Sequence, residues 1–402
     1  MTGSRRRVLF MAEAVTLAHV TRPWVLAQAL DESRYEVHFA CAPGYENLLT
    51  DASFTRWPLW SIPGPQFLDA LARGHPVYDQ ATLARYIEDD LQILDAVKPD
   101  LVVGDFRLSL AVSAASRKIP YAAITNAHWS PYSMLGPLPL PEHPLARILG
   151  VPLATLLFRA ARPLVFAQHA LPLNRLRRRH GLDSLGDLRH AYTHGDYTLF
   201  ADTPGFVPCA ALPPNHLYLG AVLWSPKLEP PAWWNSLPQE KPFVYVTLGS
   251  SGQAQLLPDI AQELARLPVV AALATAGRVA AASLPAGLWA ADYLPGQEAA
   301  RRARLVICNG GSATVYQALA AGVPVLGIAS NLDQHLTMQA VQKAGAGILL
   351  RAGKADRHSL RMAVQKLLSV PDYIEAAKRV ADEFAAFDPA SRFRAFVDTR
   401  FV

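Results

Sequence analysis

The residues best suited to chemistry surround a glycine turn. The apolar run Leu305–Cys308 is typical of a buried parallel strand, and Asn309-Gly310-Gly311 follows it as a turn that only small residues allow. Residues 312–321 then predict a helix that stops at Gly322. Free backbone N–H groups and the positive end of the helix dipole would point at one spot, and such a spot suits a phosphate group.

A second polar cluster follows the next predicted strand. Val325–Ala329 is again a short apolar run, and Asn331, Asp333 and Gln334 come soon after it. Open α/β sheets usually bind ligands at the carboxyl ends of their strands. The order strand, glycine turn, helix and strand therefore predicts a site for a phosphate-bearing ligand at this edge of the sheet.

The same stretch carries a family resemblance. It reads NGGSATVYQALAAGVPVLGIASNLDQHLTMQA, and it resembles the donor-binding signature of the UDP-glycosyltransferase superfamily, HGGxGTxxEALxxGVPxxxxPxxxDQxxNA. The resemblance implies an α/β fold of the GT-B type, with two Rossmann-like doubly wound domains facing across a cleft. It also implies an inverting, nucleotide-sugar-dependent glycosyltransferase of the hexosyltransferase type, which uses helix dipoles and side chains rather than a metal or another cofactor.

The departures from the usual signature include Asn309 for His, Ala313 for Gly, Gln317 for Glu and Thr337 for Asn. Asn309 can donate a neutral hydrogen bond to a diphosphate, but charge-assisted bonds are roughly twice as strong. Either the diphosphate is bound less tightly or another cation substitutes, and Arg278 is one candidate. Asn309 can also be interpreted as a turn residue. Gln317 keeps hydrogen-bonding capacity toward the ribose hydroxyls and loses the charge.

The resemblance extends to further donor contacts. Asp333 and Gln334 match the pair that contacts the sugar hydroxyls, with loop capping as the alternative. Trp289 lies where relatives stack the donor base, although a core Trp is also consistent with the sequence. A glycine-serine turn after the first strand of the second domain lies near the diphosphate in the family. The complete predicted donor set is Thr247, Gly249, Ser250, Arg278, Trp289, Asn309, Gly310, Gly311, Ser312, Ala313, Thr314, Gln317, Asp333 and Gln334.

His19 is the candidate general base. It follows the first predicted strand, in Ala18-His19-Val20-Thr21-Arg22-Pro23, where family members carry a GH-x-x-P-like turn; here the His and the Pro are present and the Gly is lost. The resemblance implies that the imidazole removes a proton from the acceptor hydroxyl as it attacks the anomeric carbon. A typical His has a pKa of about 6.5, so a neutral imidazole is available near neutral pH. A loop His without a role is the alternative.

Asp105 is the candidate partner of that base. It ends the buried run 101–104, where a carboxylate is costly unless it has a partner. The family has an Asp at this point that accepts a hydrogen bond from the base, fixes its tautomer and stabilises the imidazolium. One alternative is that Asp105 caps the helix predicted over 108–118. Asp100, before the strand, is the second candidate for the carboxylate.

Composition excludes several classes of protein. The chain has 402 residues, 51% of them hydrophobic, and a formal net charge of +5, which suits two α/β domains and an anionic small-molecule ligand. Cys41, Cys209 and Cys308 lie far apart, which argues against a disulfide framework and against a zinc site. No segment has the roughly 20 uninterrupted apolar residues of a membrane span. A cytoplasmic location is therefore expected.

The basic charge is uneven along the chain. Between His143 and Leu182 there is no Asp or Glu, while the arginines in this interval are Arg147, Arg159, Arg162, Arg175, Arg177, Arg178 and Arg179. A solvated helix face is the simpler interpretation. The sharper interpretation is a surface on residues 147–179 that contacts anionic lipid or a lipid-linked acceptor at the membrane. Nucleic acid is not expected as a partner, because no recognised binding motif accompanies the arginines.

Short apolar runs alternate with helical patterns along the chain, which predicts parallel α/β domains. Strands are predicted over 8–11 and 36–40, with a helix from about residue 21 to 30 between them. Residues 131–179 are rich in Pro, Leu and Arg. They are interpreted as loops and helices inserted in the first domain, where they would shape the acceptor pocket.

A proline-rich joint sets the predicted domain boundaries. Residues 223–242 contain five prolines, a density that disfavours helix and sheet alike: Pro226, Pro230, Pro231, Pro238 and Pro242. Residues 1–222 are then an N-terminal acceptor-binding domain and residues 243–385 a C-terminal domain for the nucleotide-sugar donor. Residues 386–402 predict a final helix, which in the family's fold often returns to the N-terminal domain.

Three functions remain open at this point. The first is transfer of a sugar from a UDP- or dTDP-linked donor to a hydroxyl of an apolar or lipid-like small-molecule acceptor. The second is binding of a nucleotide sugar or a partner without transfer, because the signature has lost its His and its Glu. The third, an epimerase or hydrolase, ranks last because few acidic residues are near the predicted cleft. The sequence does not name the sugar, the base or the acceptor.

Overall fold

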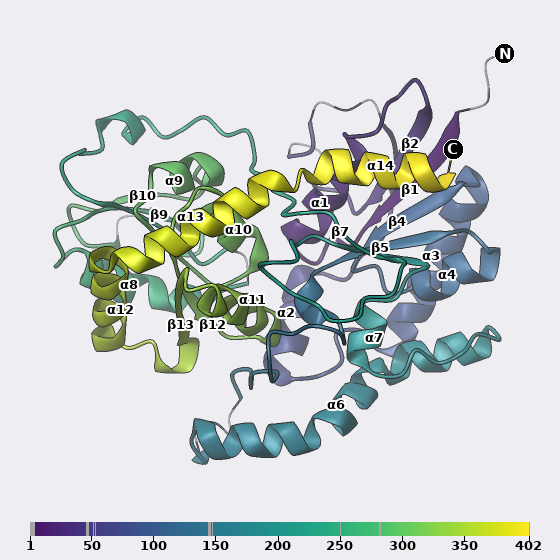
Figure 1. Ribbon diagram of the computed structural model, residues 1–402, viewed down its shortest axis with the longest axis horizontal. Coiled ribbons are helices and arrows are strands. Elements are labelled where there is room, and N and C mark those ends of the chain that lie inside the picture. Colours follow the sequence, from purple (N-terminus) through teal and green to yellow (C-terminus); the bar gives the residue numbers. More distant parts are fainter. Residues whose placement is uncertain are drawn as a thin grey trace. The chain divides into compact units, whose positions relative to one another are not determined.

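The chain forms two compact units in the computed structural model, which describes residues 5–45, 48–50, 52, 54–143, 146, 148–249, 251–280 and 283–401 (Figure 1). Unit 1 comprises Met1–Met134, Leu156–Val222 and Phe387–Val402. Unit 2 comprises Leu135–Thr155 and Leu223–Ala386. Each unit is built around its own parallel sheet, which confirms the predicted α/β fold class.

Unit 1 contains a seven-stranded sheet of order β3-β2-β1-β4-β5-β6-β7. Its strands are β1 (Arg6–Ala12), β2 (Tyr35–Cys41), β3 (Thr55–Pro58), β4 (Leu101–Asp105), β5 (Tyr121–Thr125), β6 (Tyr197–Phe200) and β7 (His216–Tyr218). The order changes direction between β1 and β4, and this is the position where doubly wound sheets place their ligands. The two strands pair in parallel, with Ala12 opposite Asp105, so their carboxyl ends meet.

The helices of unit 1 follow the alternating pattern of the sequence. They are α1 (Leu17–Ala27), α2 (Gly64–Arg73), α3 (Gln80–Val97), α4 (Leu110–Arg117), α7 (Leu188–Tyr192) and α14 (Pro389–Phe401). The final helix α14 packs in this unit, where the fully buried Phe393 contacts Phe10 of β1. One prediction was wrong by about a turn: α1 begins at Leu17 rather than near residue 21, and it includes Pro23.

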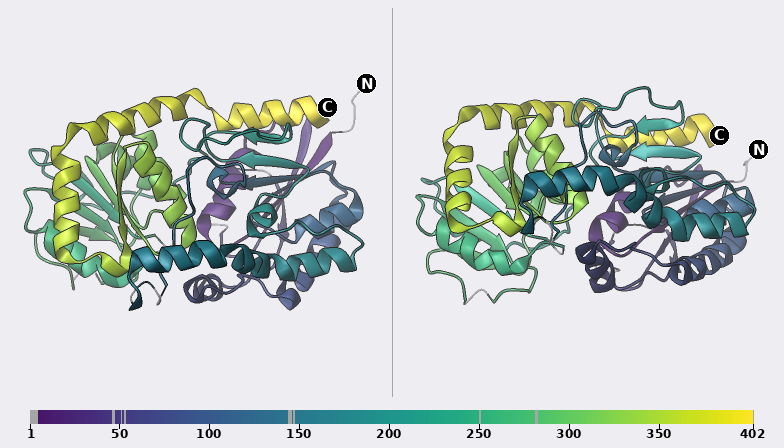
Figure 2. Two further views of the ribbon diagram at one scale, coloured as in Figure 1. Left: turned by 60° about the horizontal axis from the view of Figure 1, so that its bottom comes forward. Right: turned by 90° about the horizontal axis from the view of Figure 1, so that it is seen from below.

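Unit 2 contains a six-stranded sheet of order β10-β9-β8-β11-β12-β13. Its strands are β8 (Phe243–Thr247), β9 (Val270–Ala274), β10 (Trp289–Ala291), β11 (Leu305–Cys308), β12 (Val325–Ala329) and β13 (Gly347–Arg351). Its helices are α8 (Leu257–Leu264), α9 (Gly296–Arg302), α10 (Ser312–Ala320), α11 (Leu332–Lys343), α12 (Arg357–Ser369) and α13 (Pro371–Ala386). The central strands β8 and β11 are buried along their whole length because helices cover the sheet, as Figure 2 shows.

Residues 135–155 precede the predicted boundary at residue 222, yet they group with unit 2. Arg351 of β13 donates to the carbonyl oxygens of Leu140 and Pro141 at 2.8 and 2.9 Å and pairs with Glu142 at 2.9 Å. The Glu142 N–H donates to Ser330 O at 2.9 Å. This segment is therefore held by long-range contacts that no local pattern encodes. Residues 223–242, predicted as a joint, also belong to unit 2.

The segment from residue 151 onward forms α6 (Val151–Arg179), a 29-residue helix. Pro163 and Pro172 lie inside it, and each removes one helical hydrogen bond and favours a bend. Figure 1 shows α6 bent along its length. Among the described residues, the structure holds no helix with the length and hydropathy needed to cross a bilayer.

Candidate functional site

The predicted glycine turn has the geometry that the sequence indicates. β11 ends at Cys308, the turn follows, and α10 begins at Ser312. Gly310 has a φ of +79°, and a Cβ there would lie 2.8 Å from Met338 Cγ, so a glycine is required. Gly311 is the N-cap and provides no side-chain cap. The first N–H groups of α10, on residues 312–314, therefore stay directed out of the helix end.

The Asn309 side chain forms its hydrogen bonds with other residues of the protein. Its side chain is 5% exposed, its Oδ1 accepts from the Gly311 N–H at 3.1 Å, and its Nδ2 donates to Ser251 Oγ at 2.9 Å. An Asn that closes on an amide two residues later stabilises a turn. The geometry thus favours the turn interpretation over a direct bond to a diphosphate.

The glycine-serine turn after β8 lies beside the first turn. Thr247 pairs in register with Cys308, so the two strand ends are neighbours, and Thr247 Oγ1 accepts from the Gly249 N–H at 3.3 Å. Arg278 donates to the carbonyl oxygens of Gly249 and Gly252 at 2.5 and 2.9 Å. Burial lowers the pKa of Arg278 from its usual value. Ser250, also in the predicted donor set, lies outside the described residues.

The polar cluster that follows β12 lies at the same strand ends as the two glycine turns. Gln334 is 2% exposed, and it forms a capping box with Asn331 at the start of α11. Its Oε1 accepts from the Ser330 N–H at 2.8 Å, and its Nε2 donates to Ser251 Oγ at 3.4 Å. Asp333 is in the first turn of α11 and partly exposed. Three strand ends therefore converge on Ser251, which supports the predicted single edge, while Gln334 itself acts as a cap.

Two other predicted donor residues have protein partners. Gln317 Nε2 donates to the carbonyl oxygen of Trp224 at 2.6 Å. A Glu at this position could not donate that bond, which gives a local reason for the departure from the family signature. Trp289 lies on the edge strand β10 and packs against Trp233, with ring centroids 5.3 Å apart. Both side chains remain partly exposed.

In unit 1, the structure brings His19 and Asp105 together. His19 lies in the first turn of α1 and Asp105 at the end of β4, with His19 Nδ1 2.7 Å from Asp105 Oδ1. The Asp105 side chain is 0% exposed and that of His19 is 20% exposed. Ser109, rather than Asp105, is the N-cap of α4, so the capping alternative is wrong. Asp100 pairs with Arg6 at 3.0 Å.

Arg22 is the residue that sequence reasoning missed. Its Nε donates to Asp105 Oδ2 at 2.8 Å and its Nη2 to Asp105 Oδ1 at 2.7 Å. Its Nη1 donates to Asn126 Oδ1 at 2.7 Å. The bidentate pair is buried, so Arg22 provides the charge partner that a buried carboxylate needs. The available signal was the spacing from His19, which puts both side chains on one helical face once α1 starts at Leu17.

The charges around His19 select its tautomer. Arg22 Nη2 donates to Asp105 Oδ1 at 2.7 Å and lies at a longer 3.1 Å from His19 Nδ1, so its short bond goes to the carboxylate and not to the ring. An unprotonated Nδ1 would face the Asp105 oxygen at 2.7 Å, acceptor against acceptor. The proton therefore belongs on Nδ1, where it is donated to Asp105. This leaves the lone pair on Nε2, as a general base requires.

The residue after Asp105 supports the imidazole ring. Phe106 stacks on His19 with centroids 4.8 Å apart and planes inclined by 13°. Phe106 has a φ of +59°, an uncommon conformation that a surrounding structure must hold in place. The edge of Tyr192 packs against Phe106 with a centroid separation of 5.0 Å. The His19 ring is thus fixed by a stacked face as well as by a hydrogen bond.

A buried ion cluster holds the segment that follows β4. The Arg107 Nε donates to Asp90 at 2.9 Å, and its Nη1 donates to Glu13 at 3.0 Å; all three side chains are 0% exposed. Burial raises the pKa of the Glu13 carboxyl and of the Asp90 carboxyl. Because Arg107 follows Phe106 directly, this cluster fixes the backbone that carries Asp105 and Phe106.

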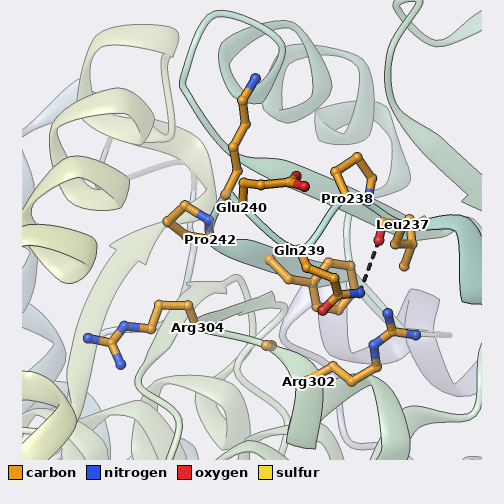
Figure 3. Close-up of a pocket in the computed structure, with 10 residues that line it drawn as sticks. Leu237, Pro238, Gln239, Glu240, Pro242, Arg302 and Arg304 are labelled. Atoms are coloured by element: carbon orange, nitrogen blue, oxygen red, sulfur yellow. Dashed lines mark hydrogen bonds between the residues drawn. The ribbon is translucent and has the colours of Figure 1, made fainter.

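A cavity of about 480 Å³ lies elsewhere in unit 2 (Figure 3). Its lining includes Glu240, Lys241, Arg302 and Arg304, at the amino ends of β8 and β11. The glycine turns lie at the opposite ends of these strands, so this cavity is distinct from the predicted donor edge. Within the part of the chain that the structure describes, no group of three or more His, Cys, Asp or Glu side chains could hold a metal ion.

Known proteins share this architecture and much of the sequence. Residues 258–392 match the family described as erythromycin biosynthesis protein CIII-like, C-terminal domain. A PGL/p-HBAD biosynthesis rhamnosyltransferase of Mycobacterium bovis (strain BCG / Pasteur 1173P2) is 53% identical over 385 residues, covering 96% of this chain and 85% of that protein. A PGL/p-HBAD biosynthesis glycosyltransferase of Mycobacterium tuberculosis (strain ATCC 25177 / H37Ra) is 52% identical over 381 residues, covering 94% and 89%.

Solved structures give the fold independently. The structure of the spinosyn rhamnosyltransferase SpnG complexed with thymidine diphosphate has a TM-score of 0.68 at 21% identity, covering 98% of this chain and 100% of that one. At this identity the likeness shows the GT-B fold alone. The relatives at 53% and 52% identity, which the chain matches over nearly its whole length, show the family. The chain is therefore a glycosyltransferase of the UDP-glycosyltransferase superfamily, in the same family as the PGL/p-HBAD biosynthesis glycosyltransferases.

Proposed function

We propose that this glycosyltransferase inverts the anomeric centre as it moves a hexosyl group from a nucleoside diphosphate sugar to a hydroxyl of an apolar or lipid-like acceptor. The observation that carries the proposal is the arrangement of His19 with the buried Asp105 and Arg22. A partly exposed imidazole with its Nδ1 bonded to a buried carboxylate is an arrangement for removing a proton at Nε2.

The transfer proceeds by one displacement. The acceptor hydroxyl gives its proton to His19 Nε2 as its oxygen bonds to the anomeric carbon. The bond from that carbon to the diphosphate oxygen breaks on the opposite face, which inverts the centre, and the electron pair leaves with the diphosphate. Asp105 stabilises the imidazolium that forms. The N–H groups at the start of α10 are suited to the charge that develops on the diphosphate.

Arg22 is a positioning residue in this scheme. It touches neither the acceptor nor the donor in the proposed reaction. Its two bonds to Asp105, at 2.8 and 2.7 Å, hold both carboxylate oxygens in place and set a positive charge beside them. Without Arg22, the buried carboxylate would lose two hydrogen-bond donors and the opposite charge beside it, and nothing would hold its oxygens in line with His19 Nδ1.

The donor and acceptor classes rest on the relatives as well as on the site. SpnG was solved with thymidine diphosphate, and the relative that is 53% identical is named a rhamnosyltransferase, which favours a dTDP- or UDP-linked deoxyhexose as donor. The shared PGL/p-HBAD biosynthesis name favours a related acceptor. We place the reaction in the cytoplasm, at a membrane contact through residues 147–179. No metal or other cofactor enters the proposed mechanism.

The test uses His19→Ala in the full chain, with dTDP- and UDP-sugars as donors. Transfer should fall by about a hundredfold to ten-thousandfold, because general base catalysis is lost. Binding of the nucleoside diphosphate, measured by calorimetry, should stay as in the wild type. His190→Ala is the matched control, since His190 is an exposed residue of α7 that pairs with the N-cap Asp187 at 2.8 Å. Its transfer rate should be unchanged.

Three results would contradict the proposal. Undiminished transfer by the His19 variant would remove the base. Absence of binding to every nucleoside diphosphate by the wild type would remove the donor class. Retention of the donor's anomeric configuration in the product, determined by NMR, would exclude a single displacement.

A further inference from the structure

The helix α6 has two halves that pack in opposite ways. In its second half, Phe166, Ala170, Leu173 and Leu176 are at most 4% exposed, and the last three join a hydrophobic cluster of unit 1. Their spacing of three and four residues is that of a normal core-facing helix. The second half therefore fixes α6 to the fold without help from the first half.

The first half leaves its large apolar side chains in solvent. The exposed fractions are 47% for Leu153, 63% for Leu156, 46% for Leu157 and 76% for Leu164. Steps of three, one and seven residues put these four leucines on one helical face, and the exposed Ala160 lies between them. We call these five residues the leucine stripe. Single exposed leucines are normal, whereas a contiguous apolar face marks a surface for interaction.

The charged side chains of α6 itself have one sign. No Asp or Glu occurs between His143 and Leu182. Arg159 and Arg175 are exposed on the same helix, and so are Arg178 and Arg179. Arg147 lies outside the described residues. An apolar face on a helix whose own charges are all cationic is the composition of helices that lie in the interface of an anionic bilayer, with the leucines among the acyl chains and the arginines at the phosphates.

We infer that the leucine stripe docks on an anionic lipid surface. A second copy of the chain is the less suitable occupant, because a symmetric dimer would place the same cationic segments against each other. Lipid phosphates instead supply the complementary charge. The inference deepens the proposed membrane contact and names its residues. It does not depend on the transfer chemistry, so it can fail while the proposed reaction stands.

Sedimentation of the full-length protein with lipid vesicles tests the inference. The protein should bind vesicles of phosphatidylcholine mixed with phosphatidylglycerol at least about tenfold more tightly than vesicles of phosphatidylcholine alone, since each cation near an anionic surface adds to binding. The variant Leu156→Gln/Leu157→Gln/Leu164→Gln should lose at least about tenfold of that binding. Met362→Gln, at a 53% exposed Met on α12, is the matched control and should bind as the wild type does.

A second pair of variants tests the charge. Arg159→Gln/Arg175→Gln should weaken binding to the mixed vesicles by roughly tenfold and should reduce its dependence on salt. Arg301→Gln, at an exposed arginine of unit 2, is the control. Circular dichroism melting and calorimetric binding of nucleoside diphosphate should match the wild type for every variant, which separates lost docking from lost folding.

Several outcomes would overturn the inference. One is equal binding to both kinds of vesicle, or binding to neither. Another is full vesicle binding by the folded leucine variant. A third is a wild-type dimer in analytical ultracentrifugation that the leucine variant dissociates, since a second copy would then be the occupant.

Discussion

The polar sites of the two units are stabilised by different means. In unit 1 the site depends on buried charges, because Asp105 is held between His19 and the bidentate Arg22. In unit 2 two polar side chains of the signature, Asn309 and Gln334, are neutral, and both donate to Ser251. Unit 1 therefore presents a side chain for chemistry, whereas unit 2 arranges its side chains so that backbone N–H groups stay available.

This difference has an energetic consequence. Removing one member of a buried ion pair leaves an unpaired charge in the interior, which strongly lowers the free energy of unfolding. Removing a neutral hydrogen bond costs much less. Substitutions at the buried ion pair of unit 1 should therefore lower stability more than substitutions at the neutral hydrogen bonds of unit 2.

Arg22→Met should be the most damaging change. It leaves Asp105 buried without its cation, and the free energy of unfolding should fall by about 3–5 kcal/mol. Urea denaturation measures the loss. The control is Arg73→Met, which removes an exposed pair with Asp69 and should cost about 0.5 kcal/mol or less. Equal losses in the two variants would show that the buried pair has no special weight.

The double variant Arg22→Met/Asp105→Leu sharpens this prediction. Both charges are then absent, so the double variant should be more stable than Arg22→Met alone, by about 1–3 kcal/mol. Transfer should still be lost, because His19 no longer has its acceptor. If the double variant were less stable than Arg22→Met, the stability lost in Arg22→Met would come from altered packing and not from the unpaired charge of Asp105.

Gly310→Ala should have the largest effect in unit 2. The new Cβ meets Met338 Cγ at 2.8 Å, and the backbone has a φ of +79°, so stability should fall by about 1–3 kcal/mol and donor affinity should weaken. The control is Gly277→Ala, where φ is +68° and no atom lies within 4 Å of the new Cβ. It should show only the backbone cost of about 1 kcal/mol. An equal loss at both positions would exclude close packing at the turn.

Gln317→Glu should have the smallest effect on stability, and whether it raises or lowers donor affinity is informative. It restores the residue of the family signature, yet it places a carboxylate against the Trp224 carbonyl that now accepts from Gln317. Stability should fall by about 1 kcal/mol, with no gain in affinity for nucleoside diphosphate by calorimetry. Gln255→Glu, at an exposed residue, is the control. A tighter donor complex would show that the ribose contact of the family survives here.

The sequence alone determined the local geometry of both sites. The apolar run and the small residues after it predicted the strand at 305–308, the glycine turn and the start of α10. These elements depend on residues that are neighbours in the chain. The resemblance then identified His19 and Asp105 as partners, and parallel pairing of β1 with β4 brings them together.

Only the tertiary structure decided which side chains meet across the fold. Arg22 was missed because the helix was predicted to begin near residue 21, which left His19 in a loop; the start at Leu17 puts both on one face of α1. Residues 135–155 join unit 2 through Arg351 and Glu142, more than 200 residues apart in the chain. A buried charge must find its counter-charge wherever the fold brings one, and that choice depends on long-range packing rather than on local pattern.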